Sequence, residues 1–275
     1  MKKYSYKKTF ELRGKNAVVT GGAGILGSQF CMGLADFGAN VAVVDADARS
    51  SKDLARDIAK IYKVKTVGIS CDVSDPDSVR KMAQVAERSL GPIHIVHNNA
   101  ATKTSDLKSF FAPLEHYRLE TWRKVMAVNI DAYFLVAQEF TKRMIRGKIK
   151  GSVIQTASIY GSLGPDARIY EGSWYQGSPI NTPAVYSASK GAVLALTKYL
   201  ATHLANYGIR VNSLTPGGVQ SGQNTTFEKK YSARVPLDRM ARPEEMVGAL
   251  IYLASEASSY VTGHNLIVDG GLHAW

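Results

Sequence analysis

The sequence predicts an α/β fold in which a doubly wound, mostly parallel sheet of about seven strands carries helices on both faces. Short runs of valine, isoleucine and alanine alternate with longer amphipathic stretches along the 275 residues. The short runs lack the apolar–polar alternation of half-exposed strands, which is typical of strands buried on both faces. This succession of strand and helix continues to the end of the chain, so we expect crossover connections and a parallel sheet.

The predicted elements follow these two patterns in order. Apolar runs predict strands at 17–20, 41–45, 66–71, 93–97, 152–156, 210–214 and 266–268. Amphipathic stretches predict helices near 25–37, 50–62, 76–90, 119–146, 184–207 and 243–254. No linker, repeat or low-complexity segment divides them, so we expect one domain over 1–275, with a basic N-terminal tail over 1–13.

Composition excludes several classes of protein. Hydrophobic residues make up 45% and charged residues 21% of the chain, which excludes a disordered chain, a collagen-like repeat and a coiled coil. No apolar run approaches the roughly 18 residues of a membrane helix, and the basic start lacks the apolar stretch of a signal peptide. The two cysteines, Cys31 and Cys71, cannot form a disulfide framework, so we expect free buried thiols and a cytoplasmic protein.

The net charge of +11 is spread along the chain. No zinc-finger spacing, basic zipper or RNA-binding motif accompanies the basic clusters at 2–8 and 142–150. This pattern favours a solvated basic face, or attraction of an anionic substrate or cofactor. We therefore expect a small-molecule substrate, and neither nucleic acid nor a membrane, as the partner.

Two long connections interrupt the succession of elements. Residues 98–118 follow the fourth predicted strand, and residues 159–183 follow the fifth. Long loops in compact domains are usually functional, and ligands of open parallel sheets bind at the carboxyl ends of the strands, where both connections begin. The sequence therefore predicts a site at this edge. A third segment, 216–242, is glycine-rich at its start and is predicted to be a substrate lid.

The turn after the first strand has the sequence TGGAGILG, from Thr20 to Gly27. Glycines let the backbone turn tightly and approach a diphosphate, and the helix that begins here offers free N–H groups and a positive dipole end. In this strand–turn–helix context we expect a dinucleotide and a Rossmann-type sheet. The expected contacts are Gly21, Gly24, Ile25, Leu26 and Gly27.

Acidic residues after the second and third strands indicate which dinucleotide is bound. Asp45 ends the second strand, about 20 residues after the glycine turn. A carboxylate at this position can accept hydrogen bonds from both ribose hydroxyls and repels a 2′-phosphate, so NAD is favoured over NADP. Asp47 adds negative charge, whereas Arg49 is placed to reach a 2′-phosphate and keeps NADP open. We expect Asp72 either to hydrogen-bond the adenine amino group or to cap the next helix.

Further motifs occur in one order along the chain. They are Asp72-Val73, Asn98-Asn99-Ala100, Asn129, Ser158, YSASK from Tyr186 to Lys190, Pro216-Gly217 and VDGG from Val268 to Gly271. With the glycine turn, they make residues 14–271 resemble the short-chain dehydrogenase/reductase family, in its small single-domain branch. The resemblance implies additional cofactor contacts at Asp72, Val73, Asn98, Ala100, Tyr186, Lys190, Pro216, Gly217 and Val219.

The resemblance also implies the catalytic roles. Tyr186 would exchange the proton of the substrate hydroxyl, and Lys190 would lower its pKa and hold the nicotinamide ribose. Ser158 would hydrogen-bond the reacting oxygen, and Asn129 would hold a water that relays protons from Lys190. Asn98 would shape the loop beside the ribose, and no metal site is implied.

The helix expected around the catalytic pair agrees with these roles. Tyr186 and Lys190 are four residues apart and therefore share one helix face. A free tyrosine has a pKa of about 10, and a nearby ammonium together with a positive nicotinamide ring would lower it. We expect Thr182 and Pro183 to start the helix as N-cap and first residue, and Gly208 to end it.

Three departures from the family's pattern mark this chain. Gly24 and Gly27 are spaced as in the larger, nucleotide-sugar-modifying members, and Ala101 replaces the glycine that usually follows Asn-Asn-Ala. The catalytic serine and tyrosine are 28 residues apart, twice the usual separation. The surplus lies in the 159–183 insertion, so we expect the roof of the pocket to differ.

The insertion carries aromatic and charged residues that suit a polyhydroxylated ring or an activated sugar. We expect Tyr160, Arg168 and Trp174 to contact the substrate together with Ser158 and Tyr186. The same residue types are enriched at subunit interfaces, so an interface role for the insertion stays open. Members of the family are usually dimers or tetramers through two long helices, which implies a homodimer or homotetramer.

Together these observations predict an NAD(H)-dependent oxidoreductase that interconverts a secondary alcohol and a ketone, with a sugar, polyol or similar polar substrate. Two alternatives stay open: a non-catalytic NAD-binding scaffold, and a nucleotide-sugar epimerase or dehydratase. The complete set of Asn129, Ser158, Tyr186 and Lys190 disfavours the scaffold. The chain is short for the separate substrate lobe of the nucleotide-sugar enzymes, which disfavours the second alternative.

Overall fold

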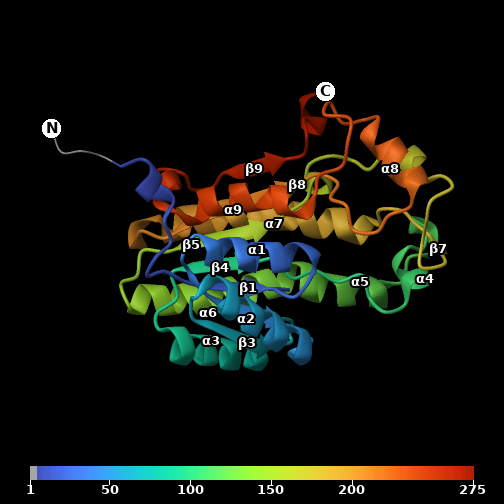
Figure 1. The fold of residues 1–275 in the computed structure, drawn as a ribbon. Coiled ribbons are helices and arrows are strands. Elements are labelled where there is room, and N and C mark those ends of the chain that lie inside the picture. The colour runs from blue at the N-terminus through green and yellow to red at the C-terminus, as the bar shows by residue number, and fades with distance from the viewer. Residues whose placement is uncertain (1–4) are drawn as a thin grey trace.

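The computed structural model describes residues 5–275 and places seven strands in one parallel sheet (Figure 1). The strands are β1 (Asn16–Thr20), β2 (Asn40–Asp45), β3 (Thr66–Ser70), β4 (Ile95–Asn98), β5 (Ser152–Thr156), β8 (Arg210–Pro216) and β9 (Asn265–Val268). Their order across the sheet is β3-β2-β1-β4-β5-β8-β9, and every neighbouring pair is parallel. The predicted doubly wound sheet is therefore confirmed.

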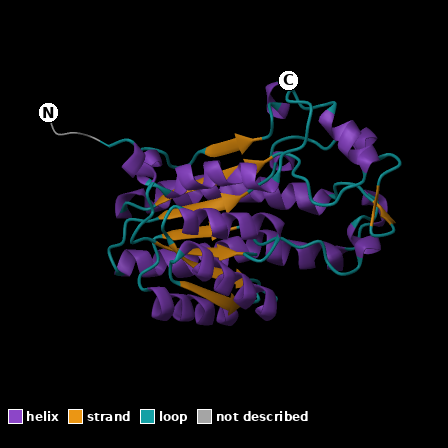
Figure 2. Ribbon diagram, viewed as in Figure 1, coloured by secondary structure: helices purple, strands orange, loops and turns teal. Residues whose placement is uncertain are grey.

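Helices cover both faces of the sheet (Figure 2). One face carries α1 (Ile25–Asp36), α2 (Ala48–Tyr62) and α9 (Val247–Ala254); the other carries α3 (Pro76–Leu90), α6 (Ala132–Arg146) and α7 (Ala184–Leu204). Successive residues of β1 face opposite layers: Ala17 and Val19 pack with α1, α2 and α9, whereas Val18 packs with α3, α6 and α7. Because both faces are covered, the strands are continuous apolar runs.

The long helix predicted over 119–146 is not one regular α-helix. It consists of α5 (Leu119–Met126), a π-helical turn (Ala127–Asp131) and α6. Turns of this kind inside helices are frequently found at functional sites. Eight 3₁₀ turns complete the described chain: Lys7–Phe10, Leu114–His116, Ile159–Gly161, Ala167–Tyr170, Ala205–Tyr207, Pro243–Met246, Glu256–Ser258 and Leu272–Ala274.

Helix α7 begins at Ala184, with Pro183 as its N-cap. The expected cap, Thr182, is not used in this way, because its hydroxyl is hydrogen-bonded to the Tyr170 hydroxyl at 2.5 Å. The prediction for the start of this helix is therefore wrong by one residue. Its end is as predicted, since Gly208 follows the last turn in the left-handed conformation, with φ at 69°.

The N-terminal tail predicted over 1–13 is only partly separate from the fold. Its first four residues lie outside the described part of the chain, and Lys7–Phe10 forms a 3₁₀ turn. Leu12, in contrast, is buried beside α1, and its N–H donates to the Phe37 carbonyl at 2.9 Å. Its inclusion in the tail is wrong, because an apolar side chain at this point belongs to the core.

The carboxyl ends of the strands meet at the edge where α4 (Leu107–Phe110), the hairpin of β6 (Trp174–Tyr175) and β7 (Ser178–Pro179), and α8 (Thr225–Ser232) gather (Figure 1). These elements belong to the 98–118 segment, the 159–183 insertion and the 216–242 lid. An apolar cluster, separate from the two large cores, joins the insertion to the lid: Ile159, Ile169, Phe227, Tyr231, Val235, Met240 and Leu272. The insertion and the lid therefore pack together over this edge of the sheet.

Membrane spans, metal clusters and disulfides are not found in residues 5–275. No helix in this range combines the length and the apolar character needed to cross a membrane. No group of three or more histidine, cysteine or carboxylate side chains is arranged there to hold a metal ion. Cys31 and Cys71 are buried and free, as predicted, and burial raises the pKa of both thiols.

Candidate active site

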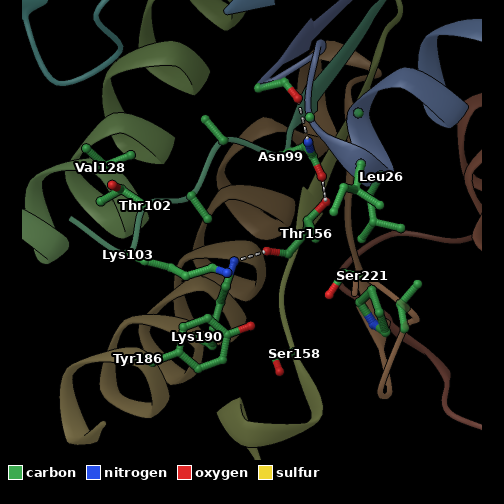
Figure 3. A pocket seen from close by; sticks show the side chains of 18 of the residues that line it. Leu26, Asn99, Thr102, Lys103, Val128, Thr156, Ser158, Tyr186, Lys190 and Ser221 are labelled. Atoms are coloured by element: carbon green, nitrogen blue, oxygen red, sulfur yellow. Dashed lines mark hydrogen bonds between the residues drawn. The ribbon is translucent and has the colours of Figure 1, made fainter. Parts of the chain in front are cut away.

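A cavity of about 790 Å³ opens at the carboxyl edge of the sheet (Figure 3). It extends from the glycine turn to the insertion and the lid. The predicted site residues that line it are Gly21, Gly24, Ile25, Leu26, Gly27, Asp45, Asp72, Val73, Ala100, Ser158, Trp174, Tyr186, Lys190, Pro216, Gly217 and Val219. Four predicted residues do not line it: Asn98, Asn129, Tyr160 and Arg168.

The glycine turn is packed so closely that side chains would not fit. A Cβ on Gly27 would lie 1.9 Å from the Gly21 carbonyl oxygen, and a Cβ on Gly21 would lie 2.8 Å from the Ala100 Cα. Gly21 also has a positive φ of 61°. Helix α1 begins directly after Gly24, and no side chain caps its first turn. The free N–H groups of this turn and the lining glycines fit the diphosphate of a dinucleotide.

The Asp45 carboxylate is held against the glycine turn at the end of β2. One of its oxygens accepts the Ala23 N–H at 3.0 Å and the other accepts the Asp47 N–H at 3.2 Å. Asp47 itself caps α2 by accepting the N–H groups of Arg49 and Ser50. The Arg49 side chain is exposed and lies 3.7 Å from the Asp53 carboxylate, outside the cavity lining. The Asp45 carboxylate is therefore fixed at the cavity, whereas Arg49, which could bind a 2′-phosphate, does not line it.

Tyr186, Lys190 and Ser158 meet at the opposite end of the cavity (Figure 3). The Lys190 Nζ is buried and donates to the Thr156 carbonyl at 2.8 Å and to the Tyr133 hydroxyl at 3.4 Å. It lies 5.9 Å from the centroid of the Tyr186 ring. Tyr186 and Lys190 therefore share the cavity-facing side of α7, as their spacing predicted.

Burial sets the protonation of this pair. Burial lowers the pKa of the Lys190 ammonium to about 7. Burial also raises the pKa of the Tyr186 phenol, an effect that the hydrogen bond with Ser158 opposes. The protein surroundings alone raise the pKa of Tyr186, because loss of water around the phenol outweighs its neighbours. The expected lowering includes the charge of a bound nicotinamide ring and stays a prediction. Burial therefore favours the neutral phenol of Tyr186 and leaves Lys190 partly protonated at neutral pH.

The side chains of the two predicted asparagines, Asn98 and Asn129, form hydrogen bonds with backbone groups and do not line the cavity. Asn129 lies in the π-helical turn, where its side-chain oxygen accepts the Thr102 N–H at 2.9 Å. Its amide donates to the Ser189 hydroxyl at 3.5 Å. Asn98 donates to the Tyr133 carbonyl at 3.0 Å. These bonds fix the 98–118 segment and α6 relative to one another at the mouth of the cavity.

A buried polar chain next to the site was missed by the sequence reasoning. The Asn99 amide donates to the Thr20 and Gly21 carbonyls at 3.2 and 3.3 Å, and the Thr156 hydroxyl donates to the Asn99 side-chain oxygen at 3.3 Å. His97 Nε2 lies 2.8 Å from the same hydroxyl, and burial lowers the pKa of His97 to about 3. These hydrogen-bonded side chains connect the glycine turn to Lys190, because the Thr156 carbonyl accepts a hydrogen bond from the Lys190 ammonium.

Two residues of the insertion that we expected to contact the substrate, Tyr160 and Arg168, do not line the cavity. The Tyr160 hydroxyl accepts a hydrogen bond from Tyr170 at 3.2 Å, inside the cluster that joins insertion and lid. Arg168 is paired with Asp166 at 2.8 Å, and 84% of its side chain is exposed. Trp174 does line the cavity, from the β6–β7 hairpin, as predicted. The neighbouring Tyr175, which was not singled out, lines it as well.

Comparison with known proteins identifies the family. A family model described as enoyl-(acyl carrier protein) reductase matches residues 22–273. The D-arabinitol 2-dehydrogenase (ribulose-forming) of Candida albicans is 32% identical, over 97% of this chain and 95% of its own.

Two solved structures are also similar over almost the whole chain. A short-chain type dehydrogenase/reductase from Mycobacterium marinum has a TM-score of 0.85 and 33% identity, with 98% of this chain and 99% of the other covered. A gluconate 5-dehydrogenase from Burkholderia cenocepacia, in complex with NADP and tartrate, has a TM-score of 0.84 and 32% identity, with 97% and 98% covered. The chain therefore belongs to the short-chain dehydrogenase/reductase family and is a pyridine-nucleotide-dependent oxidoreductase that acts on CH–OH groups.

Proposed function

We propose that this protein interconverts a secondary alcohol and a ketone on an open-chain, polyhydroxylated substrate such as a polyol or a sugar acid, with NAD(H) as the preferred cofactor. One observation carries the proposal. Ser158, Tyr186 and Lys190 meet at one end of a single cavity whose other end begins at the glycine turn. A dinucleotide laid along that cavity would bring its nicotinamide to the three side chains.

The residues at the glycine turn and the strand ends would hold the cofactor, which supplies the hydride chemistry when bound. The first turn of α1 would bind the diphosphate, and Asp45 the adenosine ribose. Val73 and Ala100 line the wall beside them. Lys190 would donate to the nicotinamide ribose, while the Thr156 carbonyl keeps its ammonium in place.

Tyr186 would manage the proton of the substrate. Its raised pKa keeps the phenol protonated at neutral pH, so it would donate its proton to the ketone oxygen as the carbonyl carbon accepts a hydride from the cofactor. Oxidation of an alcohol needs the reverse transfer and would therefore improve as the pH rises. Ser158 would hold the reacting oxygen through its hydroxyl.

The preference for NAD(H) is supported by charge at the end of β2. Asp45 lines the cavity, and the arginine that could bind a 2′-phosphate, Arg49, points to Asp53 instead. We expect NAD(H) to bind at least about tenfold more tightly than NADP(H), a difference of about 1.4 kcal/mol. In Asp45→Asn, which keeps the size and an acceptor oxygen, the discrimination against NADP(H) should shrink. Equal affinities in the wild type would contradict the preference.

The roof of the cavity supports a polar substrate of modest size. Trp174, Phe110 and Phe227 provide flat apolar walls, and the polar side chains of Thr182 and Gln223 line the cavity among them. Such a mixture suits a chain of carbon atoms that carry hydroxyl groups. The relatives named above, an arabinitol dehydrogenase and a gluconate dehydrogenase, act on substrates of this kind, as their names say.

We also infer a cytoplasmic homodimer or homotetramer. Several large apolar side chains on α5, α6 and α7 are exposed, as expected for an interface through the long helices: Leu119, Phe134 and Tyr199. Light scattering after size-exclusion chromatography would measure the assembly, and a monomer at micromolar concentration would contradict it.

The function is tested by following nicotinamide absorbance with a panel of polyols, aldonates, ketoses and simple alcohols, with NAD⁺ and NADH. Turnover of at least one polyhydroxylated compound, with little activity on simple secondary alcohols, is the expected result. An enzyme that binds NAD but turns over nothing in the panel would support the alternative of an NAD-binding scaffold. Preference for an unsubstituted apolar alcohol would overturn the substrate class.

A further inference from the structure

The charged residues that line the cavity are divided by sign along its length. Asp45 and Asp72 lie where β2 and β3 end, at the adenosine end. Lys103 and Lys190 lie on the other side, after β4 and on α7. Among the lining residues of the described chain, no aspartate or glutamate occurs at this substrate end. The substrate end is therefore a region of positive potential with one ammonium, Lys103, beyond the catalytic machinery.

Lys103 is directed into the cavity by the insertion. Its Nζ lies 4.1 Å from the centroid of the Tyr175 ring, on β6 of the hairpin. Figure 3 shows the side chain extending from the 98–118 segment into the pocket. A cation over an aromatic face keeps its charge and leaves ammonium N–H groups directed away from the ring. Tyr175 therefore positions this ammonium without neutralising it.

The backbone that carries Lys103 is held on both sides. The Thr102 N–H donates to the buried Asn129 side chain at 2.9 Å, and the Thr104 N–H donates to the Thr102 hydroxyl at 3.2 Å. Within residues 5–275, no salt bridge joins Lys103 to a carboxylate of the protein, although many other surface cations have such a partner. A positioned ammonium that points into a ligand cavity and has no carboxylate partner there is suited to a ligand anion.

We propose that Lys103, positioned by Tyr175, binds a carboxylate of the substrate, so that the preferred substrates are sugar acids rather than neutral polyols. This inference rests on the proposed function, because it assigns a charge to the polyhydroxylated substrate. A single ammonium matches one monovalent carboxylate, whereas a phosphate ester would carry nearly twice that charge. The 159–183 insertion acts here through Tyr175.

The test compares aldonates with the alditols that differ from them only by a CH₂OH group in place of the carboxylate. Kinetic constants are measured for wild type, Lys103→Met and Lys103→Glu, at low and at physiological salt. Lys108→Met removes an exposed lysine of the same segment that does not line the cavity, and serves as the matched control. Tyr175→Leu removes the ring beneath the ammonium, and Tyr175→Phe keeps it.

We expect wild type to favour the aldonate, and Lys103→Met to raise its KM about tenfold, equivalent to about 1.4 kcal/mol. The KM of the alditol should change less than about twofold, and Lys103→Glu should affect the aldonate most because two like charges then meet. Tyr175→Leu should reproduce part of the loss, whereas Tyr175→Phe and Lys108→Met should not. The effect should weaken with added salt, since the ammonium is solvent-exposed.

Two results would separate failure of this inference from failure of the proposed function. Equal changes in KM for aldonate and alditol in Lys103→Met, or none for either, would overturn the carboxylate contact while leaving the dehydrogenase activity in place. No turnover of any aldonate or alditol by the wild type would instead remove the proposed substrate class, and the inference with it.

Discussion

The two ends of the cavity are built in different ways. At the cofactor end, a turn of eight residues is packed so tightly that a Cβ on Gly27 would collide with the Gly21 carbonyl. At the substrate end, the roof is assembled from the 98–118 segment, the insertion and the lid, and a Cβ on Gly164 in the insertion would meet nothing within 4 Å. The cofactor end is a short, tightly packed turn that Asp45 and Asn99 hold with hydrogen bonds. The roof, in contrast, is assembled from three long segments that must pack against one another.

Hydrogen bonds and a ring contact join these distant segments, in addition to the apolar cluster. The Lys230 ammonium of α8 donates to the Arg168 and Glu171 carbonyls of the insertion at 3.1 and 2.8 Å. The Asn224 amide donates to the Trp174 carbonyl at 3.2 Å, and the Tyr170 and Phe227 rings stack with centroids 5.5 Å apart. The comparison indicates that the glycine turn can keep its dinucleotide-binding geometry while the roof over the substrate end changes in length and shape. The following predictions test that division of labour.

The largest effect is expected at the substrate end of the cavity, where Tyr186 lies. Tyr186→Phe should lower kcat by about 10²–10⁴-fold, because the variant lacks the hydroxyl that would transfer the substrate proton. The affinity for NAD(H) should stay within about threefold of wild type by fluorescence titration, since the ring keeps its packing. Retention of most of the activity would remove Tyr186 from the mechanism.

A pair of glycine variants contrasts the ends directly. Gly27→Ala should destabilise the protein by about 1–3 kcal/mol and weaken dinucleotide binding, because the backbone of the turn must move to admit the methyl group. Gly164→Ala should change neither quantity measurably, since its surroundings are open. Thermal unfolding and cofactor titration measure both. Tolerance of Gly27→Ala with unchanged affinity would show that the turn is not tightly packed around the diphosphate.

A pair of insertion variants distinguishes cavity from surface within the roof. Trp174→Ala should raise the substrate KM roughly tenfold, about 1.4 kcal/mol, because its ring lines the cavity. Arg168→Ala should leave the KM unchanged, since its partner is Asp166 and its side chain is exposed. Steady-state kinetics with one good substrate measure both. The reverse ranking would mean that the insertion lies differently when substrate binds.

A pH effect on stability, separate from catalysis, is also expected at Lys190. Burial lowers the pKa of Lys190 from 10.5 to about 7, so between those values the unfolded chain binds more protons at this site than the folded one. Its contribution to the free energy of unfolding should therefore rise with pH from about 7 to about 10. Urea unfolding of wild type and Lys190→Met across this range isolates it, because the variant lacks the titrating group. Parallel pH profiles for both proteins would contradict the lowered pKa.

Local patterns in the sequence predicted the glycine turn and the position of the residues around it. The order of strand, glycine turn and helix depends on residues close together, and the structure places Gly21, Gly27 and Asp45 at the cavity as expected. Tyr186 and Lys190 were also predictable, since four residues on a helix fix a shared face. The pKa of Tyr186 was not, because it depends on burial by segments far away in the sequence.

The roof was predicted in position but not in detail. The excess length of 159–183 indicated an unusual roof, yet nothing local distinguishes Arg168, which pairs with Asp166, from Trp174, which lines the cavity. The cation–π contact of Lys103 with Tyr175 joins two segments that are separate in the sequence, and no sequence motif predicts it. Asn99 was quoted within a motif, but its bonds to the glycine turn become visible only in the fold.

The division of labour is tested most directly by replacing residues 164–179 with a short Gly-Ser turn and measuring substrate KM, NAD affinity and oligomeric state together. This change removes Trp174, Tyr175 and the hairpin but leaves the glycine turn, Ser158 and α7 in place. We predict a strong rise in the substrate KM, an NAD affinity within about threefold of wild type, and an unchanged assembly. An unchanged KM together with loss of the oligomer would contradict this account and show that the insertion serves as a subunit interface.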